Sequence, residues 1–169
     1  MPIRVREILL AWSVGLPLLV IDLWSKEWVL THFEEGEHRV VIEGFFNLVL
    51  VRNEGAAWGI FSGYAHGLTV FSAVVLVLLL GFQSALFERR PSHRIIFGLM
   101  LAGIVGNMVD RIRFQAVTDF LDFHIGDRHW PSFNVADSCI CVAVFLYLIM
   151  TWKTPPESEK PSVASVLER

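Results

Sequence analysis

Acidic and amide side chains are concentrated in the stretch from Asn107 to Asp137, between two apolar runs. The stretch contains Asp110, Arg111, Arg113, Asp119, Asp122, Asp127 and Asn134. Ser132 and Ser138 have no Lys or His partner at helical spacing, and no nucleophile elbow accompanies them. The metal-binding spacings CxxC and HExxH do not occur in the sequence. Carboxylates are therefore the groups most suited to chemistry here.

A pair of carboxylates held close together shares one proton. One member then acts as a base toward water and the other as an acid toward a substrate carbonyl, which suits peptide hydrolysis without a metal or another cofactor. Asp137 is one candidate, and its partner is Asp110, Asp119 or Asp122. Asp119 and Asp122 share a face if VTDFLDF is helical and point opposite ways if it is extended. A plainer interpretation, ion pairs with nearby arginines, also stays open.

The composition indicates the surroundings in which these groups must work. Hydrophobic residues make up 54% of the 169 residues, charged residues make up 18%, and the mean hydropathy is +0.53. Soluble proteins carry roughly 25% charged residues, so a membrane protein with one compact domain, residues 1–153, is predicted. The net charge of −3 argues against a nucleic-acid partner. Cys139 and Cys141 are expected to be small buried residues, with neither a disulfide nor a metal between them.

Four apolar runs predict a mainly α, integral membrane protein, a four-transmembrane-helix bundle. We predict spans at about 8–30, 67–87, 94–113 and 137–153. A span needs about 20 residues, and three of the four charge-free runs are shorter than that. Each of these three must therefore continue past a carboxylate to cross the membrane. Those carboxylates are Asp22, Asp110 and Asp137.

The distribution of basic residues predicts the orientation. The segments 1–7, 88–94 and 153–169 carry eight Lys and Arg in 31 positions, whereas segments 23–66 and 111–136 carry six in 70. The positive-inside rule therefore places both termini in the cytoplasm. Asp22, Asp110 and Asp137 then reach the same depth near the outer face. Charge at membrane depth is costly, so these residues are functional candidates.

The segments outside the spans predict a small extracytoplasmic β-sheet. Residues 40–51 are rich in β-branched and aromatic residues and indicate one or two strands broken at Gly44, within an outer β region at about 38–62. Residues 154–169 are predicted to form a disordered cytoplasmic tail. An aromatic belt at the outer interface is expected from Trp24, Trp28, Trp58 and Trp130.

Five motifs, in order along the chain, resemble those of the lipoprotein signal peptidase family, also called signal peptidase II. They are Asp22 with Ser25 and Lys26 (D-x-x-S-K), Asn53 to Gly59 (N-x-G-A-A-[FW]), Gly106 to Arg111 (G-N-x-x-D-R), Val117 to Phe120 (V-x-D-F) and Phe133 to Ser138 (F-N-x-A-D-[ST]). Glu54 departs from the family, which often has a small polar residue there; a third carboxylate would raise the pKa of the pair or alter substrate preference.

The resemblance implies a role for each matched residue. Asp119 and Asp137 would be the catalytic aspartates. The residues that would line the site, bind substrate backbone or support the site are Asn53, Gly55, Asn107, Arg111 and Asn134. Asp110 would be structural support, and Asp22 with Lys26 would brace the first span. No metal or cofactor is implied.

The resemblance also implies the reaction and its place. Family members are intramembrane aspartic endopeptidases of the bacterial inner membrane. They remove signal peptides from diacylglyceryl-modified prolipoproteins, cleaving before the lipidated Cys near the periplasmic face, and the cyclic peptide globomycin blocks them. A monomer is adequate for this mechanism. The alternatives are a non-catalytic membrane paralogue and a proton-relay transporter using Asp22, Asp110 and Asp137. Clustering of these acids at one face argues against a relay, which needs groups across the membrane depth.

Overall fold

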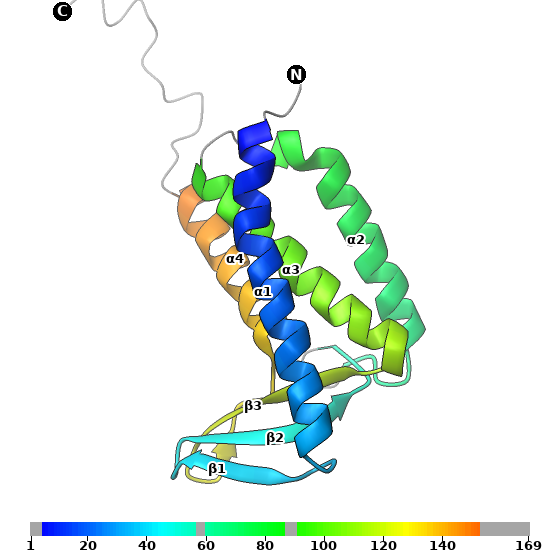
Figure 1. Ribbon diagram of the computed structural model, residues 1–169, viewed down its shortest axis with the longest axis vertical. Coiled ribbons are helices and arrows are strands. Elements are labelled where there is room, and N and C mark those ends of the chain that lie inside the picture. The colour runs from blue at the N-terminus through cyan, green and yellow to red at the C-terminus, as the bar shows by residue number, and fades with distance from the viewer. Residues whose placement is uncertain (1–4, 57–59, 87–90, 153–169) are drawn as a thin grey trace, which may run out of the picture.

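Four helices form a bundle, and a small antiparallel sheet lies across one end of it (Figure 1). The computed structural model describes residues 5–56, 60–86 and 91–152. The helices are α1 (Val5–His32), α2 (Ala65–Leu86), α3 (Pro91–Phe114) and α4 (Val135–Trp152). Each is long and apolar enough to cross a membrane. The predicted belt residue Trp58 and the predicted tail 154–169 lie outside the described residues.

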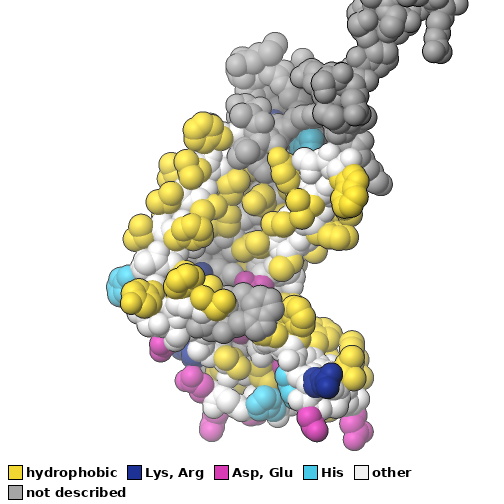
Figure 2. Space-filling view, turned by 180° about the vertical axis from the view of Figure 1, so that it is seen from behind, with side chains coloured by type: hydrophobic (Ala, Val, Ile, Leu, Met, Phe, Trp, Pro, Cys, Tyr) yellow, Lys and Arg dark blue, Asp and Glu magenta, His cyan; other side chains and the backbone are white. Residues whose placement is uncertain are grey.

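The structure has a helix at each of the four predicted spans, with ends that differ by one to three residues. Asp22 and Asp110 lie inside α1 and α3, so these helices do continue past their carboxylates. Apolar side chains cover the bundle surface, whereas charged side chains gather over the sheet (Figure 2). On α2, Val70, Phe71 and Val77 are each more than 60% exposed. In a protein that crosses the membrane several times, these side chains face lipid.

Helix α3 lies at the centre of the bundle and packs against each of the other three. Small residues permit the closest approaches. A Cβ atom added to Gly98 of α3 would collide with the backbone of Ala11 and Gly15 on α1. Glycine therefore lets the two helices pack backbone to backbone, as is common between membrane helices.

The sheet contains the strands β1 (His38–Ile42), β2 (Phe46–Asn53), β3 (Val117–Ile125) and β4 (Arg128–His129), in that order. The sequence predicts one or two strands with a break at Gly44. The structure has two, and Gly44 lies in the turn between β1 and β2 with φ of 74°. Within the described residues, the strands of the outer β region, predicted at about 38–62, end at Asn53.

The segment VTDFLDF, left open between helix and strand, is extended. It forms most of β3, which pairs with β2 so that Asp119 lies opposite Val51 and Asp122 opposite Asn47. The two aspartates therefore point to opposite faces of the sheet.

The glycine contact between α1 and α3 predicts that substitutions at two glycines differ in their effect on the free energy of unfolding. Gly98→Val should lower the free energy of unfolding by about 2 kcal/mol, because the added methyl groups push the helices apart. Gly81→Ala is the control, since a Cβ at Gly81 meets nothing within 4 Å, and it should be neutral or slightly stabilising. Reversible unfolding in mixed micelles measures both. Equal stability of the two variants would contradict the close packing described here.

Candidate active site

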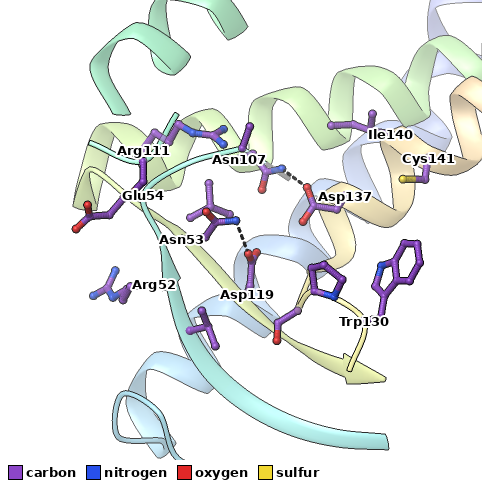
Figure 3. Close-up of a pocket in the computed structure, with 16 residues that line it drawn as sticks. Arg52, Asn53, Glu54, Asn107, Arg111, Asp119, Trp130, Asp137, Ile140 and Cys141 are labelled. Atoms are coloured by element: carbon purple, nitrogen blue, oxygen red, sulfur yellow. Dashed lines mark hydrogen bonds between the residues drawn. The ribbon is translucent and has the colours of Figure 1, made fainter. Parts of the chain in front are cut away.

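A cavity of about 660 Å³ lies where the sheet meets the bundle, between the end of β2, β3, α3 and the start of α4 (Figure 3). Three carboxylates line it, those of Glu54, Asp119 and Asp137. Asn53, Asn107 and Arg111 line it as well. One side of the cavity is apolar, with Ile140 and Trp130 among its residues.

Asp119 enters the cavity from β3 and is 2% exposed. Both of its carboxylate oxygens accept hydrogen bonds. The side-chain amide of Asn53 donates to Oδ2 at 2.9 Å, and that of Asn134 donates to Oδ1 at 2.7 Å.

Asp137 lies in the first turn of α4 and is half-buried. Asn107 donates from Nδ2 to its Oδ1 at 2.7 Å. Asn134, which precedes the helix, accepts from the Asp137 backbone N–H at 3.0 Å and donates its own backbone N–H to Asp137 Oδ2 at 3.3 Å. This reciprocal arrangement is a capping box with Asp at the third helical position. The same asparagine therefore caps α4 and hydrogen-bonds both aspartates.

The orientation of each asparagine amide follows from the donor that faces its oxygen. The backbone N–H of Gly55 donates to Asn53 Oδ1, and that of Asp137 donates to Asn134 Oδ1. The ammonium of Lys26 donates to Asn107 Oδ1 at 3.0 Å. Since these groups can only donate, each amide must turn its NH₂ group toward a carboxylate.

The surroundings favour the protonated form of Asp119. Burial and, after it, the charge of Asp137 raise the pKa of the Asp119 carboxyl from its ordinary value to about 7, although the hydrogen bonds from Asn53 and Asn134 act in the opposite direction. Two nearby carboxylates in a partly buried site resist ionising together. The pair can therefore carry one proton near neutral pH, as acid–base hydrolysis requires.

Behind the cavity, Lys26 forms a fully buried ionic cluster with two aspartates. Its Nζ lies 2.8 Å from Asp22 Oδ2 and 3.7 Å from Asp110 Oδ2, and all three side chains are 1% exposed. The ammonium also donates to Asn107 Oδ1, as described above. Lys26 thus links the ionic cluster to the amide that contacts Asp137.

The aspartates of this cluster connect distant segments of the backbone. Asp22 of α1 accepts from the backbone N–H of Ala136 at the start of α4, at 2.8 Å. Asp110 of α3 accepts from the backbone N–H of Thr118 on β3, also at 2.8 Å. The first contact positions Asp137 and the second positions Asp119, each one residue farther along the chain.

Arg111 lines the cavity and is hydrogen-bonded to the buried residue Gly55. Arg111 donates from Nη2 to the Gly55 carbonyl at 3.1 Å. Gly55 in turn donates to Asn53, so the loop after β2 is attached to α3. This contact keeps the guanidinium beside the two aspartates, which it can offset electrostatically.

The ten residues expected at the site lie in one connected region. Of the three aspartates considered as partners of Asp137, only Asp119 lines the cavity within the described part of the chain. Asp110 belongs to the buried ionic cluster with Lys26 and Asp22 instead. Asp122 lies on the other face of the sheet, where Asn47 and His129 hydrogen-bond its carboxylate at 2.9 and 2.8 Å. Sequence reasoning missed this last cluster, because only strand pairing brings Asn47 to Asp122.

The expectation that both cysteines are buried is wrong for Cys141. Cys139 is buried, but Cys141 is exposed and lines the cavity. The two thiols point to different sides of α4, because residues two apart on a helix do not share a face. Among the described residues, no three His, Cys, Asp or Glu side chains are placed to hold a metal ion.

The buried ionic cluster predicts a large effect of removing its cation. Lys26→Met should destabilise the protein by about 3–5 kcal/mol, because it leaves two buried aspartates without a counter-charge. Arg113→Met is the control: Arg113 pairs with Glu27 at 3.0 Å, but both side chains are about half exposed, so about 0–1 kcal/mol is expected. Unfolding in mixed micelles compares the two. Equal losses would show that the cluster contributes no more than a surface pair.

The chain is similar to known proteins both in sequence and in fold. The family model described as "Signal peptidase (SPase) II" matches residues 14–153. The chain is 41% identical over 140 residues to the lipoprotein signal peptidase of Oleidesulfovibrio alaskensis, covering 80% of this chain and 90% of the relative. It is 42% identical over 158 residues to that of Syntrophus aciditrophicus, covering 89% and 97%.

The fold has close counterparts among solved structures. A bacterial membrane enzyme determined by the in meso method at 2.3 Å resolution superimposes with a TM-score of 0.78 at 31% identity, covering 92% of this chain and 93% of that one. A second such structure, at 1.9 Å resolution, gives a TM-score of 0.74, also at 31% identity, and covers 89% of this chain and 94% of the other. With the family model matching most of its length, this multi-pass membrane protein belongs to the signal peptidase II family.

Proposed function

We propose that this chain is an intramembrane aspartic endopeptidase that removes signal peptides from diacylglyceryl-modified prolipoproteins, cleaving before the lipidated cysteine. One observation carries the proposal: Asp119 and Asp137, from different elements, line the same cavity and are both hydrogen-bonded by Asn134. Relatives named lipoprotein signal peptidase support the substrate class.

In the proposed reaction Asp137 begins ionised and Asp119 protonated. The Asp137 carboxylate takes a proton from water, whose oxygen attacks the scissile carbonyl carbon, while Asp119 donates its proton to the carbonyl oxygen. A proton then passes to the amide nitrogen and the C–N bond breaks. The products are a signal peptide with a free carboxyl group and a lipoprotein whose cysteine has a free amino group.

The asparagines have a distinct part in this proposal. Their NH₂ groups stabilise a carboxylate without bringing a full positive charge to it. A cation in direct contact would favour ionisation of both aspartates and remove the shared proton. Lys26 contacts Asn107 rather than either member of the pair, which fits this requirement.

The location of the cavity fits the substrate. A signal peptide is an apolar helix in the bilayer, and the lipid on its cysteine keeps the scissile bond near the membrane surface. The cavity lies at the sheet end of the bundle, where the chain changes from apolar to charged surface (Figure 2). We place that end at the periplasmic face of the bacterial inner membrane, with both termini in the cytoplasm, because basic residues are concentrated near the opposite end.

Replacing either member of the pair should abolish cleavage. Asp119→Asn and Asp137→Asn each keep the shape of the side chain but remove its ability to exchange a proton, so kcat/KM should fall by about 10³-fold or more. Purified protein and a lipidated prolipoprotein peptide provide the assay. Asp122→Asn is the control: it alters a buried aspartate of the same strand that lies outside the cavity, and it should retain most activity. Full activity in either of the first two variants would exclude the proposed pair.

The shared proton predicts how activity depends on pH. Since the pKa of Asp119 is raised to about 7, its protonated form predominates below that pH and is lost above it. The value of kcat/KM should therefore decline as the pH rises through about 7, approaching tenfold per pH unit. Initial rates across buffers of constant ionic strength measure this. A profile that rises through the same interval would contradict the acid role of Asp119.

A further inference from the structure

The cavity contains one carboxylate that the proposed reaction does not use. Glu54 follows Asn53 at the end of β2, lines the cavity and is exposed. In Figure 3 its side chain points away from both Asp119 and Asp137. A carboxylate at this position is expected either to raise the pKa of the aspartate pair or to alter substrate preference. Because Glu54 points away from the pair, the geometry favours an effect on substrate preference.

Among the described residues, neither Arg52, two residues from Glu54, nor Arg111, which also lines the cavity, forms an ion pair with Glu54. The Arg52 guanidinium lies 4.6 Å from the centroid of the Phe114 ring. Arg111 donates to the Gly55 carbonyl. Within residues 5–56, 60–86 and 91–152, Glu54 forms no ion pair. Its carboxylate is therefore available to a charge that arrives with the substrate.

The two sides of the cavity indicate which part of the substrate reaches Glu54. Ile140 and Cys141 of α4 lie on one side of the aspartates, and Arg52 and Glu54 lie on the other (Figure 3). The apolar signal peptide belongs on the side formed by the membrane helix, since polar groups are disfavoured there. The chain beyond the scissile bond then leaves across the end of β2, toward water.

We infer that Glu54 is a specificity-determining residue that favours substrates with a cationic side chain at the second or third position after the lipidated cysteine. This inference rests on the proposed function and adds to it a preference within the substrate class. The expected effect is modest, because Glu54 is exposed and its interactions are weakened by water and salt. It should fall as the ionic strength rises.

Three lipidated peptides that differ only at these two positions test the inference: one with Lys, one with Gln and one with Glu. The unaltered full-length protein in vesicles of neutral lipid should cleave the Lys peptide with a kcat/KM about three- to tenfold above that of the Glu peptide. Glu54→Gln should bring the ratio close to one, and Glu54→Lys should invert it. Each variant's rate on the Gln peptide is its internal reference.

Glu43→Lys is the matched control for Glu54→Lys, because it makes the same change of net charge but in the exposed turn between β1 and β2. It should keep the ratio of the unaltered protein. A Lys-to-Glu ratio that is the same in the unaltered protein, Glu54→Lys and Glu43→Lys would overturn this inference alone. Failure of the unaltered protein to cleave the Gln peptide would overturn the proposed function and this inference with it.

Discussion

The site depends on the difficulty of placing two carboxylates together in a partly buried cavity. Such a pair is stable only if it carries one proton or is strongly compensated by charge. Here Asn53, Asn107 and Asn134 supply neutral donors to Asp119 and Asp137. These contacts stabilise a single negative charge and leave room for a proton, which is the state that hydrolysis by a carboxylate pair requires.

The bundle and the sheet have complementary parts in building this arrangement. The sheet contributes Asp119 and Asn53, and the bundle contributes Asn107 and Asp137, so neither contains the site alone. The buried carboxylate of Asp110 joins the bundle to the sheet through the backbone N–H of Thr118, next to Asp119. Within the bundle, the buried carboxylate of Asp22 joins α1 to α4 through the backbone N–H of Ala136, next to Asp137. Because hydrogen bonds are stronger where water is scarce, a few contacts of this kind can position the site accurately.

Much of this architecture could be predicted from the sequence. Apolar runs predicted the four helices, and β-branched and aromatic residues predicted strand structure in the region of β1 and β2. The choice between Asp110, Asp119 and Asp122 could not be made from spacing, because pairing of β3 with β2, about 70 residues away, determines which face each presents. The resemblance, rather than the pattern, singled out Asp119. The contact of Lys26 with Asn107, 81 residues away, and the exposure of Cys141 likewise depend on tertiary packing.

The most direct measurement of the central claim is a crystal structure with a lipidated peptide in which a tetrahedral hydroxyl-bearing carbon replaces the scissile carbonyl. The account predicts that this hydroxyl lies within about 3 Å of a carboxylate oxygen of both Asp119 and Asp137. A peptide bound in the cavity with its hydroxyl out of reach of either carboxylate would contradict it.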